Sequence, residues 1–232
     1  MSEHISKQFD AELESVRSRV LQMGGLVEEQ IIHAMEALIS GDMESIDRVI
    51  ANDYRVNAME VELDESCSHI IARRQPAAAD LRLLIAIIKT ITDLERIGDE
   101  AQKIGRMAKL IHAAGRQHMP RMDLSQIADR AVQMLRQSLD SFARLDVVTA
   151  MAVVRQDSEV DDAFRAIMRQ LITFMMEDPR TITRALEILF IAKAVERIGD
   201  HTKNMAEYVI YMVKGRDVRH TSIEDVEKEL LD

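Results

Sequence analysis

The sequence "ERIGD" occurs twice in the chain, at residues 95–99 and again at 196–200. Around both copies apolar residues recur in alternating steps of three and four, which places them on one face of a helix. The first seam consists of Leu94, Ile97, Ala101, Ile104, Ala108 and Ile111. The second, which includes one threonine, consists of Ile191, Val195, Ile198, Thr202, Met205, Val209 and Met212. Each copy is therefore expected to lie in a long helix of a helical bundle.

The same periodicity extends over most of the chain and predicts six long helices, at residues 6–40, 42–74, 77–114, 123–144, 146–177 and 180–215. Turn residues fall between them. Gly41 is expected to end a helix, Asp42 to cap the next one, and Pro76 and Pro179 to stand where helices begin. Tryptophan is absent and aromatic residues make up 3% of the chain, which disfavours a β-sheet. The predicted fold class is all-α.

The two halves of the chain resemble each other beyond the repeated pentapeptide. Residues 41–57 align with residues 145–161 at an offset of 104, whereas the pentapeptide recurs at an offset of 101. The aligned pairs include Asp42 with Asp146, Val49 with Val153, Asp53 with Asp157 and Val56 with Val160. This pattern predicts an internal duplication of a three-helix unit. We expect two tandem three-helix bundles, at residues 1–116 and 117–216, and an acidic tail at 217–232.

Charge and hydropathy exclude several classes of protein. The formal net charge is −10 and the densest basic run is "ARRQP" at 72–76, so nucleic-acid binding is disfavoured. The longest uninterrupted apolar run, "LLIAII" at 83–88, is far shorter than the roughly 20 residues that span a bilayer. The N-terminal residues lack the features of a secretory signal. We expect a cytoplasmic protein that does not insert into membranes, with its one cysteine, Cys67, in the core.

Acidic side chains stand at positions that cost stability. Glu95 with Asp99, and Glu196 with Asp200, are like charges four residues apart in a helix, and each pair costs a few tenths of a kcal/mol. The glycine inside each copy costs about 1 kcal/mol relative to alanine. An acidic stripe opposite an apolar seam is commonly just the solvated face of a helix. The repetition of both costs at matching positions favours a function instead.

The preceding helix of each unit carries further acids. Asp53 and Asn57 match Asp157 and Asp161 at the same spacing. If these helices are antiparallel neighbours, the acids of two helices converge in each half. Several carboxylates in one place raise each other's pKa unless a cation is present, and oxygen-rich sites favour hard cations such as Mg²⁺, Mn²⁺ or ferric iron. Spacing alone leaves both the solvated face and the metal site open.

Longer segments carry a resemblance to a known family. The sequences "RRQPAAADLRLLIAIIKTITDLERIGDEAQKI" (residues 73–104) and "MMEDPRTITRALEILFIAKAVERIGDHTKNMAEYVIYMVKG" (175–215), with the closing "DVRH", resemble the PhoU proteins, bacterial regulators of phosphate uptake. The likeness covers essentially the whole chain. It implies six helices in two similar three-helix bundles.

The resemblance also implies metal clusters, of iron or zinc, at Glu/Asp-x-x-x-Asp motifs on the protein surface. The matching positions are Glu95, Asp99, Glu196 and Asp200, and Asp157 with Asp161 also fits. Asp53 departs from the motif because Asn57 carries no negative charge. We expect the first-half site to bind metal more weakly or to recruit Glu60 or Asp64. Manganese and magnesium stay open beside iron and zinc.

The function that the resemblance implies is regulatory rather than enzymatic. It is negative regulation of phosphate uptake and of the phosphate-starvation response. The protein would be an adaptor between the ATPase subunit of the phosphate ABC transporter and a sensor histidine kinase. We also expect a homodimer, because extensive apolar seams often leave surface to share.

Two alternatives remain beside this interpretation: a carboxylate-metal hydrolase and a purely structural helical scaffold. No Glu-x-x-His pair is present, so a di-iron carboxylate site is disfavoured. His201 directly follows Asp200, about 100° around the helix, and is expected to be a surface residue. Arg96 and Arg197, inside the repeated motif, are expected to form salt bridges with neighbouring acids.

Overall fold

The computed structural model describes residues 7–113, 115, 122–219 and 221. Within them it contains seven α-helices, one 3₁₀ helix and no strand. The first half consists of α1 (Lys7–Ser40), α2 (Met43–Asn52), α3 (Tyr54–Arg74) and α4 (Ala78–Ala113). The second consists of α5 (Ser125–Arg144), α6 (Val147–Glu177), the 3₁₀ helix η1 (Pro179–Thr181) and α7 (Ile182–Lys214). The all-α prediction is confirmed.

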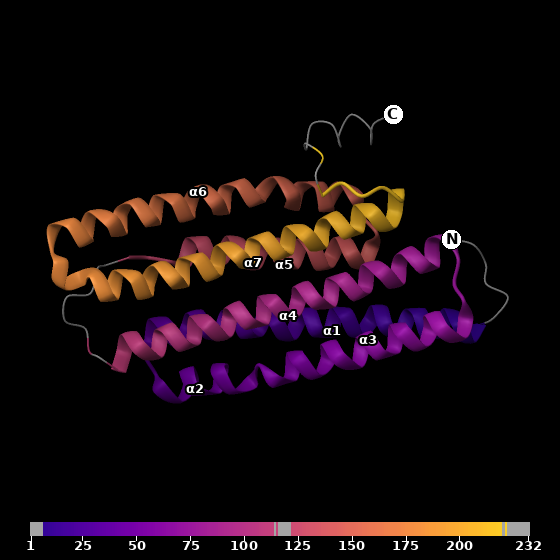
Figure 1. The fold of residues 1–232 in the computed structure, drawn as a ribbon, viewed down its shortest axis with the longest axis horizontal. Helices are drawn as coiled ribbons and strands as arrows, with labels where there is room; N and C mark the ends of the chain where they lie inside the picture. Colours follow the sequence, from indigo (N-terminus) through magenta and orange to yellow (C-terminus); the bar gives the residue numbers. More distant parts are fainter. Residues whose placement is uncertain (1–6, 114, 116–121, 220, 222–232) are drawn as a thin grey trace.

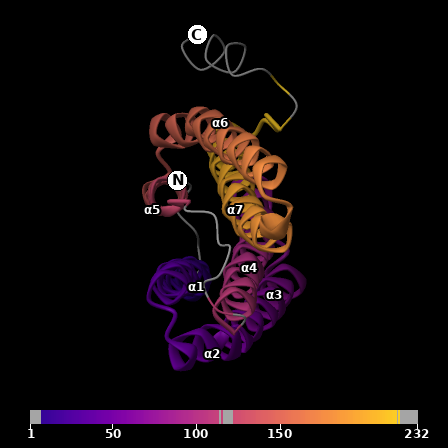
Figure 2. The same cartoon turned by 90° about the vertical axis from the view of Figure 1, so that its left-hand side faces the viewer.

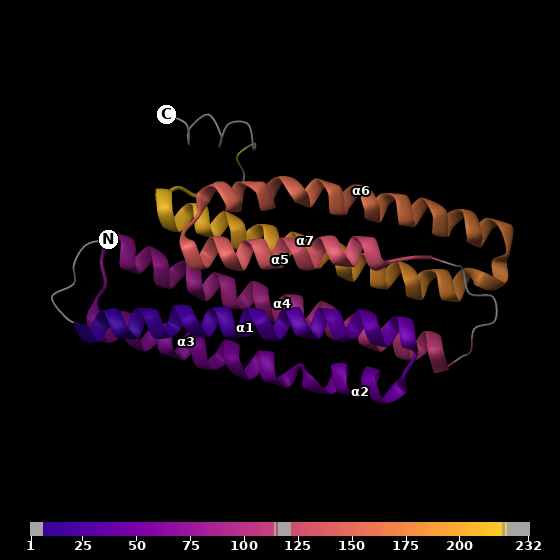
Figure 3. The same ribbon diagram turned by 180° about the vertical axis from the view of Figure 1, so that it is seen from behind.

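The two halves form two tandem bundles that lie side by side with their long axes roughly parallel, α1–α4 below and α5–α7 above in Figure 1. The end-on view shows α4 and α7 at the junction of the halves (Figure 2). These two helices run in opposite directions and make the most extensive contact of any pair of elements. From behind, α1 and α5 also lie side by side, and they too are in contact (Figure 3). The predicted pair of bundles is confirmed.

The helix boundaries follow the local signals of the sequence. Gly41 adopts a positive φ of 72°, which costs glycine little, and its N–H bonds to the carbonyl of Ala37. The Asp42 carboxylate accepts hydrogen bonds from two N–H groups of the first turn of α2, and Asp146 does the same for α6. The duplicated aspartates are therefore equivalent helix caps, as their alignment suggested.

The predicted helix at 42–74 is divided into α2 and α3 at a single residue, Asp53. The break is slight, because Asp53 keeps right-handed helical angles and its carbonyl still accepts from the N–H groups of Val56 and Asn57. In the second half α6 runs without interruption through the matching residue, Asp157. The first half therefore has one more helix boundary than the sequence predicted, at a candidate site residue.

One continuous hydrophobic core runs through both halves. The two predicted seams are buried, nearly all of their apolar residues belong to this core, and Cys67 is fully buried, as expected. None of the described helices is both long and apolar enough to cross a bilayer. The predicted boundary at 116/117 lies outside the described residues, as does the tail 217–232 apart from residues 217–219 and 221.

Candidate functional site

The glycine of each repeated motif lies against the preceding helix of its own half. A methyl group on Gly98 would lie 3.3 Å from Val56 Cγ1 and 3.5 Å from Asp53 Oδ1. On Gly199 it would lie 3.4 Å from Val160 Cγ1 and 3.8 Å from a carboxylate oxygen of Asp157. The duplicated units thus place the same valine and the same aspartate against the same glycine. The two aspartates are buried there, with 5% and 7% of their surface exposed.

The candidate acids of each half lie close enough to act on one another. In the first half burial, and then the charge of Asp99, raises the pKa of Glu95, and Glu60 and Asp53 add to that rise. Burial and then the charge of Asp53 raise the pKa of Asp99. Asp64, the other substitute ligand considered, acts instead on the thiol of Cys67. The first-half acids therefore converge as predicted, with Glu60 among them.

The second half repeats this convergence. Burial raises the pKa of Asp200 to about 6, and the charges of Glu196, Asp157 and Asp161 contribute to the rise. These acids come from two consecutive helices, α6 and α7. In both halves, therefore, acids from neighbouring helices act on one another electrostatically.

The stripe opposite the apolar seam suggested that the acids face bulk solvent, but most of them do not. Asp53, Asp157 and Glu196 are buried, Glu95 and Asp200 are half-buried, and Asp99 is exposed. The reason is that α4 and α7 are surrounded: each packs on the other and on the preceding helices of its own half. The side opposite the seam therefore meets a neighbouring helix.

The contacts of the acids differ between the halves. In the first half Asp53 accepts hydrogen bonds from two amides, Gln30 Nε2 at 3.2 Å and Asn57 Nδ2 at 3.4 Å. In the second half the ammonium of Lys203 lies 2.8 Å from Asp157 Oδ2, and that of Lys193 contacts both carboxylate oxygens of Glu196. Arg165 lies 3.3 Å from Asp161. The first set is thus held by amides and the second by cations.

Oxygen donors define what these sets can bind. Within residues 7–113, 115, 122–219 and 221, no three His, Cys, Asp or Glu side chains stand close enough to share a metal ion as placed. In the first half, however, the buried oxygens Gln30 Oε1 and Asn57 Oδ1 accept no hydrogen bond. Gln30 Oε1 and Asp53 Oδ1 both lie 3.5 Å from the point where a Gly98 methyl group would stand. Hard cations prefer such oxygens, so the first set fits a metal and metal binding stays a prediction.

Sequence reasoning missed a second polar cluster, at the junction of the halves. Asp93, 2% exposed, accepts hydrogen bonds from His201 Nδ1 at 2.7 Å, Tyr208 Oη at 2.8 Å and Asn204 Nδ2 at 3.3 Å. The prediction that His201 is a surface residue is wrong, because the face of α7 that carries it packs on α4. The signal in the sequence was the position of Asp93 between Ile91 and Leu94, where an apolar helix face would be expected.

The arginine of the second motif also bridges the halves. Arg197 forms an ion pair with the buried carboxylate of Glu100 on α4, which confirms its predicted salt bridge. Arg96 is exposed, and its charge lowers the pKa of Glu95. Because Arg197 also lowers the pKa of Asp99, a residue of the second motif acts on the first.

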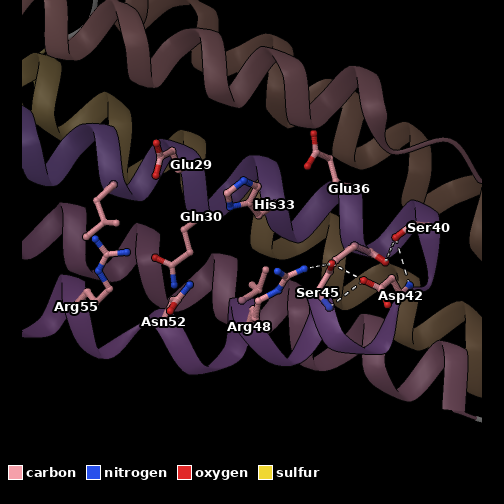
Figure 4. A pocket seen from close by; sticks show the side chains of 13 residues that line it. Glu29, Gln30, His33, Glu36, Ser40, Asp42, Ser45, Arg48, Asn52 and Arg55 are labelled. Carbon is pink, nitrogen blue, oxygen red and sulfur yellow. Dashed lines mark hydrogen bonds between the residues drawn. The ribbon is translucent and has the colours of Figure 1, made fainter.

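A groove of about 710 Å³ lies between α1 and the α2–α3 segment (Figure 4). It is lined by Glu29, His33 and Glu36 of α1 and, on the opposite wall, by Arg48 and Arg55. Gln30 and Asn52 point toward each other across it. Gln30 therefore lines the groove and also bonds to Asp53, which connects the groove with the first set of acids.

Known proteins resemble this chain along its whole length. The model of the PhoU domain matches residues 20–108 and 124–209. The chain is 50% identical over 232 residues to the phosphate-specific transport system accessory protein PhoU of Serratia marcescens, a match that covers 100% of this chain and 95% of that protein.

Solved structures agree with this. The crystal structure of PhoU from Pseudomonas aeruginosa is 47% identical, with a TM-score of 0.86, and the match covers 90% of this chain and 100% of that one. The phosphate transport system regulatory protein PhoU from Streptococcus pneumoniae is 27% identical, with a TM-score of 0.84 and coverage of 90% and 99%. Since the domain model matches both halves and a relative at 50% identity spans the whole chain, the chain belongs to the PhoU family.

Proposed function

We propose that this chain is an accessory protein of phosphate-specific transport that restrains phosphate uptake and the phosphate-starvation response. The observation that carries the proposal is the end-to-end match, at 50% identity, to a protein named for that accessory role. The regulatory name of the Streptococcus pneumoniae structure supports the same direction. In this role the protein is not an enzyme. It works in the cytoplasm as an adaptor between the ATPase subunit of the phosphate ABC transporter and a sensor histidine kinase.

The proposal includes binding of multivalent cations, iron, zinc, manganese or magnesium, by the carboxylates of the repeated motifs. The support is electrostatic: burial and mutual repulsion raise the pKa of Glu95, Asp99 and Asp200, and a bound cation would relieve that repulsion. The donors are oxygens, which suits hard cations. A bound cation would stabilise the contact between a motif helix and the helix before it.

The proposal also includes a homodimer. Three apolar residues on one stripe of α7, Ile182, Leu186 and Phe190, are 40% to 50% exposed, as is Leu110 on α4. Contiguous exposed apolar side chains commonly mark a protein interface. The Phe190→Glu variant should therefore lower the molar mass measured by light scattering, and an unchanged mass would exclude this surface as the dimer contact.

The regulatory function is tested by deletion and complementation. In phosphate-rich medium, cells that lack the gene should take up phosphate as starved cells do, and the wild-type protein should restore repression. Normal repression in the deleted cells would contradict the proposal. A quadruple variant, Glu95→Gln, Asp99→Asn, Glu196→Gln and Asp200→Asn, keeps side-chain shape but removes four charges. If it restores repression fully, the structural scaffold is favoured over a metal-dependent role.

Partner binding and the enzymatic alternative are tested with purified protein. The ATPase subunit and the kinase should each be retained by the immobilised protein, and a chelator should weaken the retention if metal supports it. Phosphoester hydrolysis that disappears in the quadruple variant would favour the carboxylate-metal hydrolase instead.

A further inference from the structure

The duplication makes the two carboxylate sets directly comparable, residue by residue. Asp53, Glu95 and Asp99 in the first half correspond to Asp157, Glu196 and Asp200 in the second. The same offsets identify which neighbours have changed. Residues that are the same in both halves are those that the shared fold requires, and residues that differ show how the two sets of acids have diverged.

Three neighbours of the acids are exchanged so that the second half gains two lysines and loses Glu60, whereas Arg106, whose charge lowers the pKa of Asp99, gives way to Glu207. Thr92 and Gln102 of the first half correspond to Lys193 and Lys203 of the second, and both lysines contact the acids there. Glu60, which accepts a hydrogen bond from Thr92 at 3.2 Å, corresponds to Phe164. The ring of that phenylalanine lies beneath the Lys193 ammonium, 5.4 Å from the ring centroid.

A further exchange concerns the buried amide. Gln30, 6% exposed, corresponds to Met134, 1% exposed. The Gln30 amide donates to Asp53, which fixes its oxygen as the free atom, and that oxygen lies beside Gly98 without a hydrogen bond. Methionine offers no such oxygen. The second half has therefore lost a neutral oxygen donor and gained two ammonium groups, while its number of carboxylates stays at four because Asp161 stands where the first half has Asn57.

The grooves that lead to the two sets of acids differ as well. The groove lined by Leu26, Gln30 and Arg55 has its counterpart in a smaller one, about 290 Å³, lined by Arg130, Met134 and Glu159. In the counterpart Arg130 forms an ion pair with Glu159 at 2.6 Å across the helices. At the matching positions of the first half, leucine and arginine form no such pair, and the groove is about 710 Å³. The groove that leads to Gln30 is therefore the larger one.

We infer that the two sets are not equivalent, in the order opposite to that expected from Asn57: the first half holds the multivalent cation, and in the second half Lys193 and Lys203 take the cation's place. This inference deepens the proposed function and rests on the cation binding proposed there. Four carboxylates of the second half, Asp157, Asp161, Glu196 and Asp200, meet three contacting cations, counting Arg165. In the first half no described cation contacts Asp53, Glu60, Glu95 or Asp99 within salt-bridge distance. A metal would have to displace ammonium groups in the second half only.

The test is a titration of chelator-treated full-length protein with Mn²⁺, followed by electron paramagnetic resonance and calorimetry. Asp53→Asn with Asp99→Asn should weaken the tightest binding at least tenfold, which corresponds to about 1.4 kcal/mol. Asp157→Asn with Asp200→Asn, the matched control, should change it by less than about twofold. Circular dichroism checks that each variant is folded.

Exchanging the neighbours gives a sharper test. Lys193→Thr with Lys203→Gln gives the second half the neighbours of the first and should create a further class of Mn²⁺ site. Thr92→Lys with Gln102→Lys should weaken the original site at least tenfold. The inference is overturned if the two aspartate double variants weaken binding equally, or if neither exchange alters it. If neither the wild-type protein nor any variant binds Mn²⁺, the cation binding in the proposed function fails as well. This outcome differs from equal weakening by the two double variants, which overturns the inference alone.

Discussion

Replacing Asp93 with alanine should strongly destabilise the contact between the two halves. Its carboxylate is 2% exposed and accepts three hydrogen bonds, from His201, Asn204 and Tyr208, all on α7. Burial, and then the charge of Asp93, raises the pKa of Tyr208, so this hydroxyl stays protonated and donates. The substitution removes the common acceptor and leaves three donors in a buried interface.

The magnitude follows from those donors. An unsatisfied buried polar group costs about 1–3 kcal/mol, and removal of one partner from a buried charged pair costs about 3–5 kcal/mol. Some relief comes from Asn204 and His201, which can turn toward other acceptors or water. We therefore expect the free energy of unfolding to fall by about 3–5 kcal/mol. Asp93→Asn, which keeps one acceptor oxygen, should cost about 1–2 kcal/mol.

The assay is urea denaturation, followed by far-ultraviolet circular dichroism and by hydrogen exchange of the α4 and α7 amides. Asp140→Ala serves as control, because Asp140 is exposed on α5 and contacts only Arg144, at 3.8 Å; it should change stability by less than about 0.5 kcal/mol. A loss below about 1 kcal/mol for Asp93→Ala would refute the argument that this carboxylate ties the halves together.

Three further outcomes are expected. Gly199→Ala should stabilise the protein by about 0.5–1 kcal/mol in thermal denaturation, because its new methyl group meets only ordinary van der Waals contacts. Gly98→Ala should stabilise it less, because the nearest atom to its new methyl group is only 3.3 Å away. Equal stabilisation by the two variants would contradict this reasoning. Burial raises the pKa of Glu207 to about 7 from 4.5. Because the folded state then binds the proton more tightly, stability should fall as pH rises from about 4.5 to 7, and Glu207→Gln should remove about 2–3 kcal/mol of that fall in urea titrations at pH 5 and pH 7.5. An identical fall in the variant would exclude Glu207 as its source. Arg197→Ala should lower the free energy of unfolding by about 1–2 kcal/mol, because the buried Glu100 carboxylate then keeps only one cationic partner, the partly exposed Lys103. Unchanged stability in urea denaturation would show that the ion pair between Arg197 and Glu100 adds none.

Much of the fold could be predicted because its signals are local. A helix face repeats every three or four residues, so the seams that contain Ile97 and Ile198 were visible without any partner. Helix caps depend on a side chain and the N–H groups of the next turn, which is why Asp42 could be assigned as a cap from the sequence, and its aligned partner Asp146 caps α6 in the same way. The break at Asp53 was not predictable, because it changes the backbone angles hardly at all.

The candidate site could be predicted only in part, for a related reason. The spacing of Glu95 and Asp99 placed them on one stripe, and the repeat suggested which acids of the preceding helix would join them. Neither the spacing nor the repeat indicated how far α4 and α7 are covered by other helices. For that reason the sequence did not show that several of these acids are partly or fully buried.

The sequence by itself determined the helices, their caps, the duplication and the family. Only the tertiary structure decided the contacts between residues far apart in the chain, such as His201 with Asp93 and Lys203 with Asp157. The physical reason is that the rotation of a packed helix about its axis depends on all of its neighbours together, whereas its periodicity depends on its own residues alone. That rotation directs lysines toward one set of acids and leaves the oxygen of Gln30 beside the other.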